Sequence, residues 1–230
     1  MCSTFKVLAV AAVWKRVDEK TETLDRFVRY DEKQLLAYAP VTREHVKEGG
    51  MTLEALCAAA IEQSDNTAGN LLLEAIGGPA SLTDFARSLG DSFTRLDRNE
   101  PTLNDTVAGE ERDSTTPAAM CRDLQRLFRS DFLSANSRDR LLRWMEGCQT
   151  GTKMIRASVP GGWRVGDKTG RSGSGANNDI GIVQPPTGGP IFLAIYVVAP
   201  DASPEARDNV VAEAAKVPIA ALTGPPGAPK

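Results

Sequence analysis

The sequence predicts an α+β protein in which helices and an antiparallel sheet occupy different parts of the chain. Residues 1–150 consist mainly of segments with helical apolar spacing, whereas residues 151–217 contain three strand-like segments followed by one helical segment. Two of the strand-like segments are joined by QPPTGG, which is typical of a hairpin turn. We therefore expect a mainly helical lobe over 1–150, strands and a last helix over 151–217, and a flexible tail over 218–230.

The predicted helices of the first half have clear start and stop signals. Residues 3–17 lack glycine and proline and are apolar on nearly every face, which predicts a buried helix. A helix over 52–64 begins at Thr52, a preferred capping residue. Two further helices, from Asn66 and over 79–90, each end at glycine.

The rest of the chain changes character after residue 90. Residues 91–116 are charged and show little periodicity, and so predict a long loop of the kind that is usually functional or disordered. TPAAMCRDLQRLFRS and SANSRDRLLRWMEGC predict two helices, and WRVGDKTG, NNDIGIVQPP and PIFLAIYVVAP predict three strands. Ser203 and Pro204 mark the start of the last helix.

Composition excludes several classes of function. The 230 residues suit one domain or two lobes that share a site, and 41% hydrophobic with 25% charged residues is ordinary for a soluble protein. A net charge of −3 offers no basic surface for nucleic acid, and no apolar run is long enough to span a membrane. We therefore expect neither nucleic acid nor a membrane as partner. As separate expectations, the partner is a small-molecule substrate and the protein is a monomer.

Cysteine and histidine usage argues against metal chemistry. No C-x-x-C pair is present, which argues against a zinc cluster or a disulfide framework. Up to two disulfides are still possible, but we favour free buried thiols for Cys2, Cys57, Cys121 and Cys148. A catalytic zinc site needs several His or Cys ligands, and His45 is the single histidine. A Ser-His-Asp triad is disfavoured for the same reason, because His45 would have to be its base. We expect no metal or other cofactor.

The first motif that can carry chemistry is Ser-x-x-Lys at residues 3–6. Residues three apart share one helix face, so the Ser3 hydroxyl and the Lys6 amine can meet. A buried lysine can be neutral at pH 7 and accept the proton of a serine nucleophile. The same four residues also suit an ordinary helix start.

Three more short elements can carry chemistry. Ser64-Asp65-Asn66 can supply a proton relay and an amide for substrate, or simply cap a helix. Lys168-Thr169-Gly170, at the end of a predicted strand, can bind a carboxylate. In the long loop, Glu100 and Asn104 can hold a water with Glu100 as general base, or belong to a solvated loop.

The order of these elements is more informative than any one of them. Ser-x-x-Lys, S-D-N, a loop glutamate and K-T-G occur in the order that is typical of class A β-lactamases. The sequence resembles that family from residue 1 to about 217, through MCSTFKVL, ALCAAAIEQSDNTAGNLLL, TRLDRNEPTLN, ERDSTTPAAM and GWRVGDKTG. The resemblance implies a β-lactamase/DD-peptidase-like fold, with an antiparallel sheet flanked by helices plus an all-helical lobe.

The resemblance also implies the catalytic roles. Ser3 would be the acylated nucleophile and Lys6 its proton acceptor, while Ser64 would pass a proton to the β-lactam nitrogen. Glu100 with Asn104 would activate the water that deacylates the enzyme. Whether the lysine or the glutamate drives acylation is disputed for the family.

The remaining site residues follow in the same way. The substrate-binding residues that the resemblance implies are Tyr38, Asn66, Asn104, Lys168, Thr169, Gly170 and Arg171. The backbone N–H groups of Ser3 and Arg171 would form the oxyanion hole. Arg98 and Asp113 match the ion pair that closes the family's omega loop.

Two departures from the family are visible. Members often place an arginine on the strand after K-T-G to bind the substrate carboxylate, but GSGANND has none, and Arg171, Lys153 or Arg207 are the possible substitutes. Cys57 and Cys2 match cysteines that form disulfides in some members, but their partner positions hold other residues here, so we expect free thiols.

Three hypotheses follow. The first is a β-lactamase that opens penicillins and cephalosporins, and the second is a penicillin-binding or D-Ala-D-Ala peptidase, against which Glu100 argues. Because the family has a helix and two strands before Ser-x-x-Lys, the third is a partial sequence that lacks these elements and is inactive until they are restored. The family is exported, which implies a periplasmic or secreted full-length protein, although this chain has no signal-peptide pattern.

Overall fold

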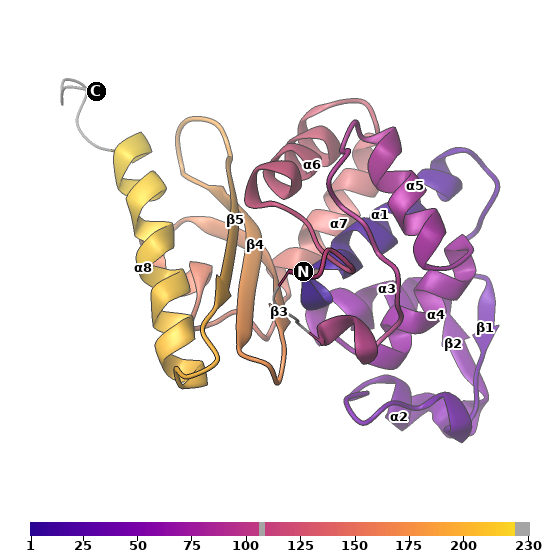
Figure 1. Ribbon diagram of the computed structural model, residues 1–230. Coiled ribbons are helices and arrows are strands. Elements are labelled where there is room, and N and C mark those ends of the chain that lie inside the picture. The colour runs from indigo at the N-terminus through magenta and orange to yellow at the C-terminus, as the bar shows by residue number, and fades with distance from the viewer. Residues whose placement is uncertain (106–108, 224–230) are drawn as a thin grey trace.

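The computed structural model describes residues 1–105 and 109–223, with side chains described up to residue 221. It confirms the α+β class, because helices surround an antiparallel sheet (Figure 1). The helices in the described part are α1 (Phe5–Asp18), α2 (Thr42–His45), α3 (Leu53–Glu62), α4 (Asn66–Ile76), α5 (Pro79–Ser88), α6 (Pro117–Arg129), α7 (Ala135–Glu146) and α8 (Pro204–Thr223). The strands are β1 (Phe27–Arg29), β2 (Gly50–Thr52), β3 (Arg164–Arg171), β4 (Ala176–Gln184) and β5 (Ile191–Val198).

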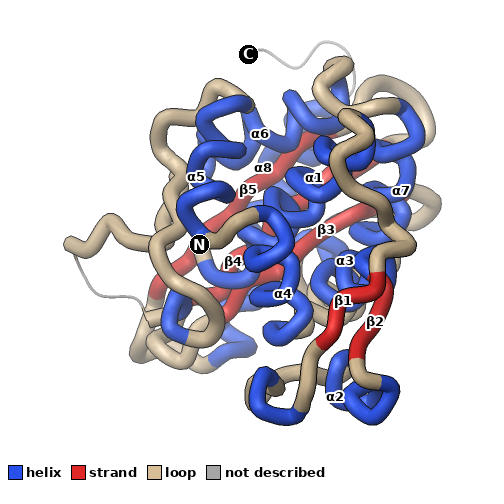
Figure 2. Tube along the Cα trace, turned by 90° about the vertical axis from the view of Figure 1, so that its right-hand side faces the viewer, coloured by secondary structure: helices blue, strands red, loops and turns tan. Residues whose placement is uncertain are grey.

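The main sheet has the strand order β3-β4-β5, and each neighbouring pair is antiparallel. The predicted hairpin is present, since β4 ends at Gln184 and β5 begins at Ile191. Helix α8 covers one face of the sheet, and the remaining helices lie on the other side (Figure 1). Strands β1 and β2 form a separate small pair beside α2 (Figure 2).

Helix α1 is the centre of the larger core. Every residue from Phe5 to Trp14 is buried, including Lys6, as the all-apolar segment predicts. Helices α3, α4, α5 and α7 pack around α1. This burial gives the short 3-10 turn that precedes α1, η1 (Cys2–Thr4), a rigid support.

The residues predicted to start and stop the helices do so in the structure. The Thr52 side chain accepts a hydrogen bond from the Ala55 amide at 3.2 Å, which caps α3. Helix α4 ends at Gly77, whose φ of 102° lies in the left-handed region that a residue with a Cβ avoids. Pro79 occupies the first turn of α5, where no backbone donor is needed.

The expected boundary of the tail at residue 218 is wrong, because α8 continues to Thr223 with Pro218 inside it. The apolar face explains the continuation: Val211, Ala215 and Ile219 are spaced four apart and are all buried in the cluster between α8 and the sheet. That packing offsets the backbone hydrogen bond that the proline removes. Residues 224–230 lie outside the described residues.

Candidate active site

Ser3 lies in η1 and Lys6 one turn later in α1, and their side chains meet as the i, i+3 spacing predicts. Lys6 Nζ donates to Ser3 Oγ at 2.9 Å, to the Ser64 carbonyl oxygen at 2.8 Å and to Asn66 Oδ1 at 2.7 Å. Lys6 is fully buried, and this burial lowers the pKa of its amine despite the opposing charge of Glu100. A lysine held this way releases its proton more readily than an exposed lysine does.

The loop glutamate completes a continuous chain of hydrogen bonds. Ser3 Oγ donates to Glu100 Oε1 at 2.9 Å, and the same oxygen lies 3.2 Å from Lys6 Nζ. Asn104 Nδ2 donates to the other oxygen, Glu100 Oε2, at 2.5 Å. The serine hydroxyl is therefore held between an amine and a carboxylate, both with fully buried side chains.

The backbone of Glu100 is clamped from α4. Asn70 Oδ1 accepts from the Glu100 amide at 2.8 Å, and Asn70 Nδ2 donates to the Glu100 carbonyl oxygen at 2.9 Å. Sequence reasoning missed Asn70, because an asparagine within a helical segment carries no signal of a partner 30 residues away.

Arg98 and Asp113 close the base of this loop. Arg98 Nε donates to Asp113 Oδ2 at 2.5 Å, and the Asp113 side chain is 1% exposed. Asp113 Oδ1 also accepts from the amides of Asp97 at 2.7 Å and of Arg98 at 2.9 Å. The pair therefore holds the backbone on which Glu100 is mounted.

The S-D-N segment caps a helix, as one of its two interpretations predicts, and also contacts both buried lysines. Asp65 caps α4 by accepting from the Ala68 amide at 2.9 Å. Ser64, with φ of 57°, turns its carbonyl oxygen to Lys6 while its hydroxyl accepts from Lys168 Nζ at 2.8 Å. One turn thus joins two buried lysines.

Strand β3 brings K-T-G against the serine. Burial and, secondarily, the charge of Lys6 lower the pKa of Lys168 to about 8. A Cβ on Gly170 would lie 2.9 Å from the Met1 carbonyl oxygen and 3.1 Å from the Ser3 amide nitrogen. Glycine is therefore required at this position for β3 to approach η1 closely.

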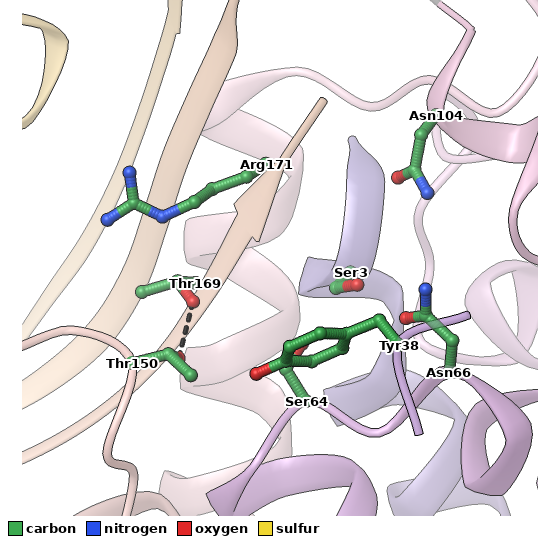
Figure 3. A pocket seen from close by; sticks show the side chains of 8 residues that line it. All are labelled: Ser3, Tyr38, Ser64, Asn66, Asn104, Thr150, Thr169 and Arg171. Atoms are coloured by element: carbon green, nitrogen blue, oxygen red, sulfur yellow. Dashed lines mark hydrogen bonds between the residues drawn. The ribbon is translucent and has the colours of Figure 1, made fainter. Parts of the chain in front are cut away.

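A pocket of about 350 Å³ opens over the serine. It is lined by Ser3, Tyr38, Ser64, Asn66, Asn104, Thr150, Thr169 and Arg171 (Figure 3). Tyr38 is half-exposed at this pocket, and its hydroxyl donates to the Gln63 carbonyl oxygen at 3.1 Å. Thr150 was not foreseen from the sequence; its hydroxyl lies 2.6 Å from that of Thr169 and so orients it.

The possible substitutes for the missing arginine occupy different places. The Arg171 side chain turns away from Ser3 (Figure 3), and its two terminal nitrogens donate to Asp208 on α8 at 2.7 and 3.0 Å. Arg207 is buried and donates to Asn177 Oδ1 and to backbone carbonyl oxygens. Lys153 is exposed and does not line the pocket.

The lone histidine lies apart from the pocket, and the cysteines are not joined in disulfides. His45 is partly exposed and its Nδ1 lies 3.0 Å from Glu48 Oε1, so this single histidine does not serve Ser3. All four cysteines are free, which confirms the expectation for Cys57 and Cys2. Within residues 1–105 and 109–223 there is no group of three or more metal-ligating side chains, and no helix suited to crossing a membrane.

These features together define a class of site. A serine hydroxyl bonded to a buried amine and a buried carboxylate, at the edge of a pocket, is an arrangement that can activate a hydroxyl as a nucleophile.

Comparison with known proteins identifies the family. The model of the family described as "Beta-lactamase enzyme family" matches residues 1–221. The chain is 43% identical to β-lactamase OXY-2 of Klebsiella oxytoca and 44% identical to β-lactamase CTX-M-97 of Escherichia coli, in each case over 94% of this chain and 74% of the relative. An ancestral class A β-lactamase structure superposes with a TM-score of 0.94 at 51% identity, covering 96% of this chain and 85% of that one. The chain belongs to the class A β-lactamase family of hydrolases.

Proposed function

We propose that the protein hydrolyses β-lactam antibiotics through an acyl-enzyme formed on Ser3. The observation that carries the proposal is the position of Ser3 Oγ, which is bonded to Lys6 Nζ at 2.9 Å and to Glu100 Oε1 at 2.9 Å. Glu100 thus lies within direct reach of the hydroxyl proton, and Lys6 is a second base at the same oxygen when its amine is neutral. The relatives named above are β-lactamases, which supports the substrate class.

In acylation, Ser3 Oγ attacks the carbonyl carbon of the lactam ring as its proton passes to Lys6 or Glu100. The oxyanion is bound by the amides of Ser3 and Arg171, and the close approach of β3 to η1 at Gly170 supports this assignment. The carbon–nitrogen bond of the ring breaks as the nitrogen takes a proton from Ser64, and Lys168 Nζ, which donates to the Ser64 hydroxyl at 2.8 Å, replaces that proton.

In deacylation, a water attacks the ester formed at Ser3. Glu100 takes the proton of this water, and Asn104, bonded to the second glutamate oxygen, orients it. Substrate is held by Asn66, Thr169 and the Lys168 charge, with Tyr38 at the pocket mouth. A D-Ala-D-Ala peptidase has no need of this second base, so the bond from Ser3 to Glu100 favours the hydrolase.

The experiment is steady-state and burst kinetics with the chromogenic cephalosporin nitrocefin. The unchanged chain should turn over many equivalents, and Ser3→Ala should abolish turnover. Glu100→Ala should release about one equivalent of colour and then stall with the acyl adduct visible by intact-protein mass spectrometry, because loss of a general base costs about 10²–10⁴-fold.

Glu74→Ala, which removes an exposed carboxylate on α4, is the matched control and should turn over normally. Rapid continuous turnover by Glu100→Ala would refute the role given to Glu100. A single burst from the unchanged chain would favour the peptidase.

We also propose that the full-length protein acts as a monomer in the periplasm or outside the cell. The support is the family to which the chain belongs. Sedimentation of the purified protein and fractionation of cells that express the full-length protein test the two parts separately.

A further inference from the structure

A pair of buried aspartates lies on β3 and β4 next to Lys168, and the mechanism above does not use it. In the antiparallel register, Asp167 is opposite Gly181 and Asp179 is opposite Thr169. The two aspartates are therefore diagonal neighbours on one face of the sheet, and the charge of Asp167 acts on Asp179. Both are completely buried.

Each carboxyl has one bonded oxygen and one oxygen without a partner. Asp167 Oδ1 accepts from Arg156 Nε at 2.6 Å, and Asp179 Oδ2 accepts from the Ile155 amide at 3.0 Å. Asp167 Oδ2 and Asp179 Oδ1 are buried and have no hydrogen-bond partner. Two such orphaned acceptors in one place are costly, since nearly all buried polar atoms in proteins are bonded.

Glycines pack closely around this pair. A Cβ on Gly151 would lie only 1.7 Å from Asp167 Oδ2, and a Cβ on Gly181 would lie 3.4 Å from the Asp167 Cβ. The backbone at Gly151 thus lies against this oxygen of Asp167, and the only side chain of this segment that acts on Asp167 is the weakly donating Cys148 thiol.

The charges around the pair are unequal. The positive charges of Arg156 and Lys168 and a hydrogen bond from the Cys148 thiol favour the ionised form of Asp167, and the charges of Lys168 and Arg156 favour that of Asp179. Burial raises the pKa of Asp167 to about 6. Burial and the negative charge of Asp167 raise the pKa of Asp179 well above its usual range.

We propose that Asp167 and Asp179 share one proton at neutral pH and act as a single negative charge that positions Lys168. The proton resides on Asp179 Oδ1 and is donated to Asp167 Oδ2, which satisfies both orphaned oxygens with one bond. Asp167 stays ionised and pairs with Arg156. Its negative charge also stabilises the protonated form of the neighbouring Lys168, whose pKa is lowered by burial. The shared proton stands independently of the proposed function, whereas its kinetic test rests on that function.

The first test is infrared spectroscopy of the folded protein. Because Asp123 also has a pKa raised to about 8, every sample carries Asp123→Asn so that its acid band is absent. The proposal predicts a protonated-carboxyl stretch at pH 7 that disappears on adding Asp179→Asn, whose amide can donate the same hydrogen bond. Absence of such a band at pH 7, or its persistence in the Asp179→Asn sample, would overturn the proposal whether or not the protein hydrolyses β-lactams.

The second test is the alkaline limb of kcat/KM for a carboxylate-bearing β-lactam, measured in the same Asp123→Asn background. If the pair carries one charge, Asp179→Asn conserves it, and the limb should keep its midpoint. Replacing both aspartates by asparagine removes the charge and should shift the midpoint to lower pH, because Lys168 then loses its proton more easily.

The two outcomes separate the proposal from its rival. If both carboxyls were ionised, Asp179→Asn alone would already shift the limb to lower pH, and this result would refute the shared proton. An unshifted limb in the double variant would refute the influence of the pair on Lys168.

Discussion

Asp113 gives the most direct way to test whether the loop that carries Glu100 is held from its base. Asp113→Ala removes the acceptor of two backbone amides, those of Asp97 and Arg98, and the partner of the Arg98 guanidinium. The carboxylate is 1% exposed, so water cannot replace it without disturbing the loop. Removing one member of a buried ion pair costs about 3–5 kcal/mol, which is a large part of the stability of a domain.

Asp113→Asn is the graded comparison. The amide oxygen can still accept from both backbone N–H groups, but the charge-assisted bond to Arg98 is lost, so a cost of about 1–2 kcal/mol is expected. Lys216→Ala, at an exposed pair on α8, is the control and should not change stability measurably.

The assay has two parts. Urea unfolding followed by circular dichroism gives the free energy of unfolding of each variant. Burst kinetics with nitrocefin should show that Asp113→Ala slows deacylation more than acylation, because Glu100 moves while Ser3 and Lys6 remain on α1 and its preceding turn. A loss below about 1 kcal/mol for Asp113→Ala, or an unchanged deacylation rate, would refute this account of the loop.

Two further predictions follow from the described contacts. Asp123 faces Asp91, and burial raises the pKa of its carboxyl to about 8, above the unfolded value of about 3.9. Between these values the folded protein holds a proton that the unfolded chain releases, so the unfolding free energy of the unchanged protein falls as pH rises. Asp123→Asn should therefore gain relative stability from about pH 4 to 8, and urea unfolding at pH 5 and 8 would contradict this if the difference stayed constant. Gly170→Ala should lower the acylation rate, since its methyl would crowd the Ser3 amide nitrogen at 3.1 Å; an unchanged nitrocefin burst rate would show that β3 can retreat without harm.

The parts of the fold that local chemistry controls were predictable from the sequence. Thr52 caps its helix and QPPTGG turns between two strands, because cap and turn preferences act over a few residues. The end of α8 was not predictable in this way. Pro218 cannot donate a helical hydrogen bond, so it favours the end of a helix. The helix continues past it because Val211, Ala215 and Ile219 are buried against the sheet.

In the candidate site, too, short-range contacts were predictable from the sequence and long-range contacts were not. Lys6 could be placed beside Ser3 from helical spacing alone. The other contacts of the serine and its neighbours cross large sequence separations, such as the 97 residues between Ser3 and Glu100 and the 104 between Lys168 and Ser64. For these, the order of motifs pointed to the residues, but not to the bonds.

By itself, then, the sequence determined the α+β class, the four motifs and the family they resemble, because periodicity, caps and motif order are properties of the chain. Only the tertiary structure decided that Arg171 turns to Asp208, that Thr150 orients Thr169, and that Asp167 and Asp179 lie side by side with unbonded oxygens. These outcomes depend on which buried atoms find a partner when distant segments pack, and no local preference specifies that.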